Sequence, residues 1–255
     1  RAADVVVVCI GHKGGWSGEN QSRTTIEIPA IQEELLATVE AAGKPVVVLL
    51  TGGRPLDLRR VEPKADAILM LWHSGIRAGY AAAGLLSGKY NPSGKLAMTF
   101  PYSTGQIPIY YNRRKPARTG DQGLYRDITS DPMYAFGHGL SYSTFEYGPM
   151  TISADKFSAN ETVYAEVTVK NLSQRDGKET VHWYISDPYS HITRPIKELK
   201  YFEKKLIKAG ESETFRFEIN PLRDLGFVDK KGERYLDKGE YRIMVGDQSI
   251  SVFVE

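Results

Sequence analysis

The chain has 255 residues, 41% of them hydrophobic, which suits one large or two ordinary globular domains and not a fibrous or disordered protein. Its 33 basic and 31 acidic residues are spread along the sequence, so no continuous basic surface is expected to bind nucleic acid. No apolar stretch approaches the roughly 20 residues of a membrane-spanning helix, and a single cysteine excludes an internal disulfide. We therefore expect no nucleic acid and no membrane among its partners.

The first part of the chain alternates the patterns of strands and helices. An unbroken, mostly β-branched run at residues 4–10 is typical of a strand covered on both faces in a parallel sheet, and we expect Cys9 within it to be a small buried thiol. The expected strands are residues 4–10, 45–51 and 66–72, and the expected helices run from Pro29, over the apolar positions Ile31, Leu35, Leu36 and Val39, to Gly43 and over residues 78–86.

Past about residue 145 apolar and polar residues alternate with a period of two. Such alternation, interrupted by turn signals such as Asp176-Gly177 and Lys238-Gly239, is typical of an antiparallel β-sandwich. The alternating runs are residues 162–170, 180–185, 213–219 and 241–245.

The stretch between these two patterns, residues 102–145, is rich in Tyr, Gly, Ser, Arg and Pro and shows no period. It is too aromatic for a disordered linker, so we expect an extended, packed connector. The predicted fold class is α/β followed by all-β. We expect a partial α/β sandwich, with a parallel-rich sheet and flanking helices, at residues 1–120, an extended connector at 121–145 and a β-sandwich at 146–255.

The loop from Gly11 to Arg23 follows the first predicted strand. Ligands of open α/β sheets bind beyond the carboxyl ends of the strands, so a site is expected here. The loop combines four glycines, an aromatic surface at Trp16 and a carboxylate at Glu19, although a surface loop with merely solvated charges has the same composition. Its glycines do not have dinucleotide-binding spacing, and the five histidines of the chain lack metal-ligand spacing, so we expect no cofactor and no metal.

Short motifs occur along the chain in a distinctive order and spacing. Those of the first part are Ser17-Gly-Glu-Asn-Gln-Ser-Arg23, Ile26-Glu-Ile-Pro29, Gly43-Lys-Pro-Val-Val-Val48, Gly53-Arg-Pro-Leu56, Trp72-His-Ser-Gly75, Asn91-Pro-Ser-Gly-Lys-Leu96 and Phe136-Gly-His-Gly-Leu-Ser-Tyr-Ser-Thr-Phe145. Those of the second part are Val167-Thr-Val-Lys-Asn171, Arg194-Pro195, Glu198-Leu-Lys-Tyr-Phe-Glu203, Ala209-Gly-Glu211 and Gly239-Glu-Tyr241. Together they resemble glycoside hydrolase family 3, the second set its fibronectin type III-like domain.

The resemblance implies a three-part enzyme. A barrel holds an aspartate nucleophile, an α/β sandwich supplies a glutamate acid/base, and a fibronectin type III-like β-sandwich follows; only the last two correspond to this chain. Glu19 matches the acid/base, and its loop neighbours Trp16, Ser17, Asn20 and Arg23 are the expected substrate-binding residues. The implied activity is that of a retaining exo-β-glycosidase, β-glucosidase-like, acting on oligosaccharides or glycosides without a cofactor.

Other interpretations stay open at this point. Trp16 could stack on a sugar or fill the interface with the barrel, and we expect Arg23 to brace the loop or to reach the barrel. The resemblance makes the N-terminal barrel of the same enzyme a partner and favours a periplasmic or secreted location. The first strand resembles a middle strand of the family's sheet, so we expect a preceding segment to fold against it. The alternative function is a non-catalytic part that serves carbohydrate binding, interdomain support or dimerisation, as in a homodimer.

Overall fold

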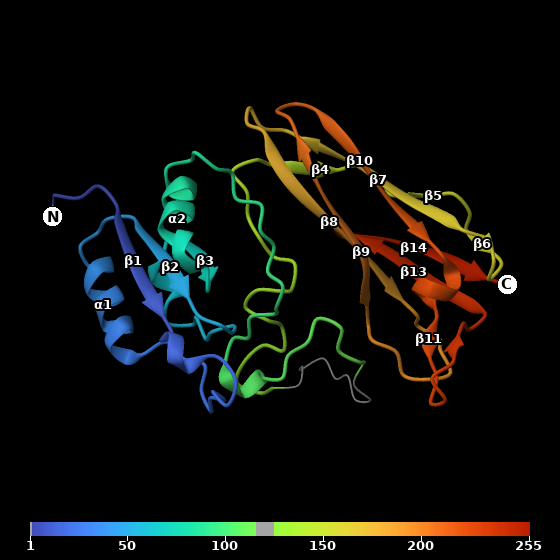
Figure 1. Ribbon diagram of the computed structural model, residues 1–255, viewed down its shortest axis with the longest axis horizontal. Coiled ribbons are helices and arrows are strands. Elements are labelled where there is room, and N and C mark those ends of the chain that lie inside the picture. The colour runs from blue at the N-terminus through green and yellow to red at the C-terminus, as the bar shows by residue number, and fades with distance from the viewer. Residues whose placement is uncertain (1, 116–124) are drawn as a thin grey trace. The chain divides into compact units, whose positions relative to one another are not determined.

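A computed structural model describes residues 2–115 and 125–255 of the chain (Figure 1). The chain divides into two compact units, which are described separately. The first contains residues 2–90, 96–110 and 125–138. The second contains residues 91–95, 111–115 and 139–255. Within the described residues, no helix is long and apolar enough to cross a membrane.

The first unit is built on a three-stranded parallel sheet with the strand order β1-β2-β3. The runs predicted as strands form it, because their β-branched and leucine side chains fit a pleated, buried surface. Figure 1 shows the three strands side by side, with α1 next to β1. The elements are β1 (Val6–Gly11), α1 (Ala30–Glu40), β2 (Val46–Thr51), β3 (Ala67–Trp72) and α2 (Ala78–Leu86), with 3₁₀ turns at Gly14–Trp16, Glu62–Lys64, Gly75–Arg77 and Thr104–Gln106.

The core of this unit lies where α1 meets one face of the sheet. Leu36 of α1 is fully buried in a cluster with Val8, Ile10 and Leu50. Only part of the predicted apolar stripe of the helix reaches this cluster. Ile31 is 72% and Leu35 50% exposed. The helix also begins one residue later than predicted, since Pro29 is its N-cap.

The prediction that the first strand is covered on both faces is wrong. Burial alternates along β1, so that Val8 and Ile10 face the core while Val7 is 46% exposed and Cys9 is exposed. The physical reason is that, within the described residues, α1 packs against only one face of the sheet at β1. The thiol of Cys9 is therefore accessible in this chain.

The described residues between Tyr90 and Phe145 contribute little regular structure, with one 3₁₀ turn at Thr104–Gln106. In the first unit, Phe100 and Tyr134 form an isolated antiparallel bridge. The amide of Gln106 links the same region by donating to the carbonyl oxygens of Thr129 and Asp131, at 2.8 and 3.3 Å. The boundary predicted between residues 120 and 121 lies outside the described residues.

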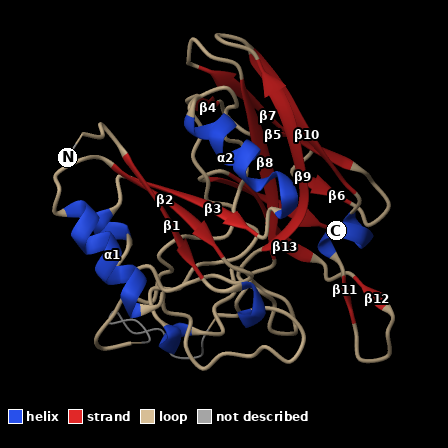
Figure 2. Cartoon of the chain, turned by 60° about the vertical axis from the view of Figure 1, so that its left-hand side comes forward, coloured by secondary structure: helices blue, strands red, loops and turns tan. Residues whose placement is uncertain are grey.

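The second unit is a β-sandwich, built of strands and loops apart from one short helical turn (Figure 2). One sheet has the order β10-β7-β4 with β5 also paired to β7, and the other has the order β6-β14-β13-β8-β9. Trp183, Phe215 and Phe217 are almost fully buried between them. The elements are β4 (Phe145–Tyr147), β5 (Thr151–Ile152), β6 (Lys156–Phe157), β7 (Val163–Asn171), β8 (Gly177–Ser186), β9 (Glu198–Ile207), β10 (Ser212–Ile219), β11 (Phe227–Val228), β12 (Arg234–Tyr235), β13 (Gly239–Val245) and β14 (Gln248–Val254), with a π-helical turn at Pro221–Leu225.

The fold class predicted from the sequence is confirmed. Each of the four alternating runs became a strand, namely β7, β8, β10 and β13. Two long strands were not predicted. β9 and β14 carry polar residues at their starts, and β9 has a register shift opposite Trp183 and Tyr184, which disrupts the period of two.

Candidate active site

Three loops meet at the carboxyl edge of the parallel sheet. They follow β1, β2 and β3, and parallel strands end at the same edge of a sheet. The backbone N–H of Gly52 donates to the carbonyl of Trp72 at 3.4 Å. A Cβ atom added to Gly53 would lie 2.7 Å from Ser17 Cβ and 2.8 Å from His73 Nε2. The loop of Glu19 is therefore in close contact with the two neighbouring loops.

The start of the Glu19 loop is anchored by the side chain of Gln32 in α1. Its Oε1 accepts from the N–H of Gly11 at 2.7 Å, and its Nε2 donates to the carbonyl of the same residue at 3.1 Å. Gly11 has a φ of +140°, and a Cβ there would lie 1.9 Å from the carbonyl oxygen of Thr51. Only glycine fits this position, so Gly11 fixes the path of the backbone where it leaves β1.

Trp16 lies at the centre of the loop, at the end of a 3₁₀ turn. The guanidinium of Arg23 lies over its ring at 3.9 Å from the centroid. The ring of His12 meets it edge-on at 5.1 Å. A cation over an indole face is a favourable contact, so Arg23 joins the end of the loop to its middle.

His12 is buried at the base of the loop and is held in one tautomer. Its Nε2 lies 2.9 Å from the carbonyl oxygen of Glu27. Since a carbonyl only accepts, Nε2 carries the proton. Burial lowers the pKa of His12, and the charges of Arg23 and Arg54 lower it further, while the bond to Glu27 opposes them. The imidazole is therefore neutral near pH 7, with Nδ1 as an acceptor.

Arg54 ties the two ends of the turn that carries Glu19. Its Nη2 donates to the carbonyl oxygen of Trp16 at 2.6 Å and to that of Gln21 at 2.8 Å. Between these two carbonyls, Gly18 and Asn20 adopt positive φ angles of +129° and +58°. The turn is thus held from outside by one guanidinium group.

The carboxylate of Glu19 is exposed at the tip of this turn. It forms no hydrogen bond and no ion pair with any described residue, and so can meet a group that arrives from outside this chain. Three buried polar atoms of the same region, His12 Nδ1, Ser17 Oγ and Arg23 Nε, also have no hydrogen-bond partner within the described residues. Buried polar atoms are nearly always paired, so these three are exceptions among the described residues.

The residues predicted for the site fall into two groups. Trp16 and Arg23 contact each other, and Ser17 packs against Gly53. Glu19 and Asn20 are exposed on the turn. Gln32 and Arg54 were not assigned a role from the sequence. Arg54 lies three residues after the end of β2, at the same sheet edge, which is the signal that could have indicated it.

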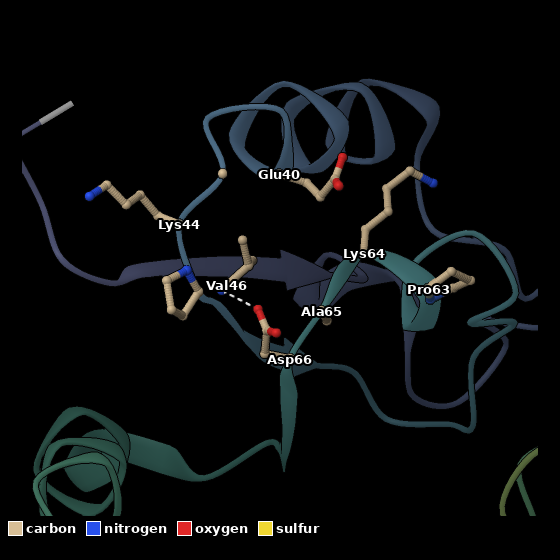
Figure 3. Close-up of a pocket in the computed structure, with 9 residues that line it drawn as sticks. Glu40, Lys44, Val46, Pro63, Lys64, Ala65 and Asp66 are labelled. Atoms are coloured by element: carbon tan, nitrogen blue, oxygen red, sulfur yellow. Dashed lines mark hydrogen bonds between the residues drawn. The ribbon is translucent and has the colours of Figure 1, made fainter.

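The opposite edge of the sheet carries an open depression of about 400 Å³ (Figure 3). Its lining includes Glu40, Lys44, Lys64 and Asp66, and the carboxylate of Asp66 accepts from the N–H of Val46 at 2.8 Å. It lies at the amino ends of β2 and β3, away from the edge where α/β sheets bind ligands. We therefore do not identify it with the active site.

Similarity to known proteins extends over nearly the whole chain. Residues 1–142 match the glycosyl hydrolase family 3 C-terminal domain, and residues 179–249 match the fibronectin type III-like domain. A periplasmic β-glucosidase of Salmonella typhimurium is 39% identical over 261 residues, which cover 99% of this chain and 34% of the relative. A β-xylosidase of Formosa agariphila is 34% identical over 247 residues, with 97% and 34% covered.

The fold is similar to that of solved structures at comparable identity. The crystal structure of a β-glucosidase from Listeria innocua in complex with glucose matches 99% of this chain and 37% of that chain, with a TM-score of 0.94 and 40% identity. The chain spans about a third of the length of these relatives. It belongs to glycosyl hydrolase family 3, in which it corresponds to the C-terminal domain followed by the fibronectin type III-like domain.

Proposed function

We propose that this chain supplies the general acid/base of a retaining exo-β-glycosidase, and that Glu19 is that residue. The observation that carries the proposal is the position of its carboxylate, exposed and unpaired among the described residues, on a turn held at the carboxyl edge of a parallel sheet. A general acid must reach the oxygen that it protonates. A carboxylate that is hydrogen-bonded to other residues of its own unit would first have to break those hydrogen bonds.

Retaining hydrolysis needs a second carboxyl group about 5 Å from the first. We place this nucleophile, an aspartate, on a barrel outside this chain. In the first step the aspartate attacks the anomeric carbon while Glu19 gives its proton to the glycosidic oxygen, so that an alcohol leaves and a glycosyl ester forms. In the second step Glu19 takes a proton from water, whose oxygen displaces the aspartate and gives the sugar with its original configuration.

The proposed substrates are oligosaccharides or glycosides that end in a β-linked glucose or xylose, because the similar proteins carry the names β-glucosidase and β-xylosidase. Trp16, Ser17, Asn20 and Arg23 are the proposed contacts in this chain. A hydroxyl can donate or accept and a guanidinium donates, so Ser17 and Arg23 carry groups that suit sugar hydroxyls.

The test is Glu19→Ala in the full-length enzyme. With aryl glycosides whose leaving groups are poor, turnover should fall by about 10²- to 10⁴-fold. Activated aryl glycosides should lose much less in the first step, because their leaving groups need no proton. Azide should restore turnover of these substrates by attacking the glycosyl ester, with a β-glycosyl azide as the product. Equal losses on all substrates without rescue would remove Glu19 from this role.

Glu34→Ala is a matched control, since Glu34 is another exposed glutamate of the same unit, on α1. It should leave turnover unchanged. The 255-residue chain alone should show no hydrolysis, because it lacks the proposed nucleophile. Measurable hydrolysis by the isolated chain would contradict the proposed division of the active site. The non-catalytic function would be favoured by two results together. The full-length Glu19→Ala variant would keep its turnover, and this chain would bind sugar or dimerise.

A further inference from the structure

We propose that Arg54 is the positioning residue of the acid/base, because its guanidinium holds the turn that presents Glu19. The inference rests on the role proposed for Glu19. Both bonds of Arg54 go to backbone carbonyls, at 2.6 Å to Trp16 and 2.8 Å to Gln21, and these carbonyls bracket residues 17–20. One side chain from a neighbouring loop therefore fixes the spacing between the two ends of the turn.

The turn is also closed by the contact of Arg23 with the Trp16 ring and by two backbone hydrogen bonds. The backbone bonds from Ser17 to Gly14 and from Gln21 to Gly18 are long, at 3.3 and 3.2 Å. A bond from a charged donor is shorter and stronger than a neutral one, as those of Arg54 are. Arg54 thus adds two short, charged hydrogen bonds to a turn that its own loop holds through one ring contact and two long backbone bonds.

Arg54 is half-buried, on a loop that is anchored in the core of the first unit. It follows β2, and Leu56 two residues later is fully buried. Beside it, Gly53 leaves room for Ser17, since a Cβ at residue 53 would lie 2.7 Å from both Cβ and Oγ of Ser17. The backbone of Arg54 is therefore held by the sheet and its core, and the two hydrogen bonds of the guanidinium connect the turn to it.

Arg54 does not act on the carboxylate directly. It forms no ion pair with Glu19 in the described part of the chain, and its guanidinium donates to the carbonyl oxygens of Trp16 and Gln21. Its loss should leave Glu19 chemically intact but misplaced. A displacement of about 1 Å can cost about 100-fold in rate, so the effect should concentrate on steps in which Glu19 transfers a proton.

The experiment compares Arg54→Ala and Arg54→Lys with Glu19→Ala in the full-length enzyme, over aryl β-glycosides of graded leaving-group ability. Arg54→Ala should lose about 100-fold on the poorest leaving group and less than about tenfold on the most activated one. Arg54→Lys should fall between, since an ammonium lacks the planar fork of donors. Added guanidinium ion should partly restore Arg54→Ala.

The double variant separates a positioning role from a merely structural one. If Arg54 acts through Glu19, adding Arg54→Ala to Glu19→Ala should lower turnover of poor leaving groups by no more than about twofold, because the proton donor is already absent. Arg60→Ala is the control, since the side chain of this exposed arginine bonds only Glu33 among the described residues. It should leave the leaving-group dependence unchanged. Thermal melts of all variants check that they fold. If Arg54→Ala does not fold, Arg54→Lys is used for the test.

The outcomes distinguish the two proposals. If the loss of turnover in Glu19→Ala were the same for all leaving groups, the proposed function itself would be overturned. A steep dependence for Glu19→Ala, combined with a flat one for both Arg54 variants or with losses that multiply in the double variant, would overturn only the positioning role of Arg54.

Discussion

The Glu19 loop, residues 12–23, and the β-sandwich of the second unit are held in shape by different forces. In the loop, the side chains of Gln32 and Arg54 bind backbone groups from outside. In the sandwich, side chains such as Trp183 and Phe215 are removed from water between two sheets. A loop that presents an exposed carboxylate cannot be buried, so directional bonds replace apolar contact. The loop should therefore respond to single polar changes, and the sandwich to changes of volume.

The largest expected effect on stability is in the sandwich. Phe215→Ala should lower the free energy of unfolding by about 3–5 kcal/mol, because it removes a fully buried ring and leaves a cavity. Denaturant unfolding followed by Trp fluorescence measures it. Glu213→Ala, at an exposed position of the same strand, should stay within about 0.5 kcal/mol of the parent. Similar losses in the two variants would contradict apolar burial as the main force here.

Gly11→Ala tests the exit of the chain from β1. It should cost about 2–3 kcal/mol, since it combines a φ of +140° with a Cβ at 1.9 Å from the carbonyl oxygen of Thr51. Gly14→Ala is the matched control, because nothing lies within 4 Å of its Cβ position. If both variants unfold at the same denaturant concentration as the parent, the close approach of Gly11 to β2 is not important for stability.

A smaller loss is expected from Gln32→Leu, which keeps the approximate size of the side chain and removes both bonds to Gly11. The cost should be about 1–2 kcal/mol, the penalty for leaving partly buried backbone groups unpaired. Hydrogen exchange should show faster opening of Gly11 and the residues after it than of β7 in the sandwich. Uniformly faster exchange in both units would mean that Gln32 does not act locally.

The smallest effect is a dependence of stability on pH from His12. Burial lowers its pKa below the ordinary 6.5, so on acidification the unfolded chain takes up the proton before the folded chain does. The corresponding stability is present above pH 6.5 and is lost as the pH falls below it. His12→Gln should therefore show a shallower decline in the free energy of unfolding between pH 6.5 and about pH 5. Parallel declines would contradict a buried neutral His12.

The sandwich was more predictable than the loop because its interactions repeat along the sequence. The period of two in residues 163–171 and 212–219 shows directly which side chains face the core. The loop has no period. Its glycines indicated unusual backbone angles, but the partners of Gly11 and Trp16 lie 21 and 38 residues away in Gln32 and Arg54. No local pattern encodes such pairs, so they could not be derived without the fold.

By itself, the sequence determined the fold class, the order of the main elements and the family, because hydrophobic periods and spaced motifs are local and redundant. Tertiary structure alone decided which face of a strand is covered, as Cys9 shows, since that depends on what packs against the sheet. It also decided how the Glu19 turn is held. The restraint comes from bonds between residues distant in sequence, whose geometry exists only when β1 and β2 lie side by side.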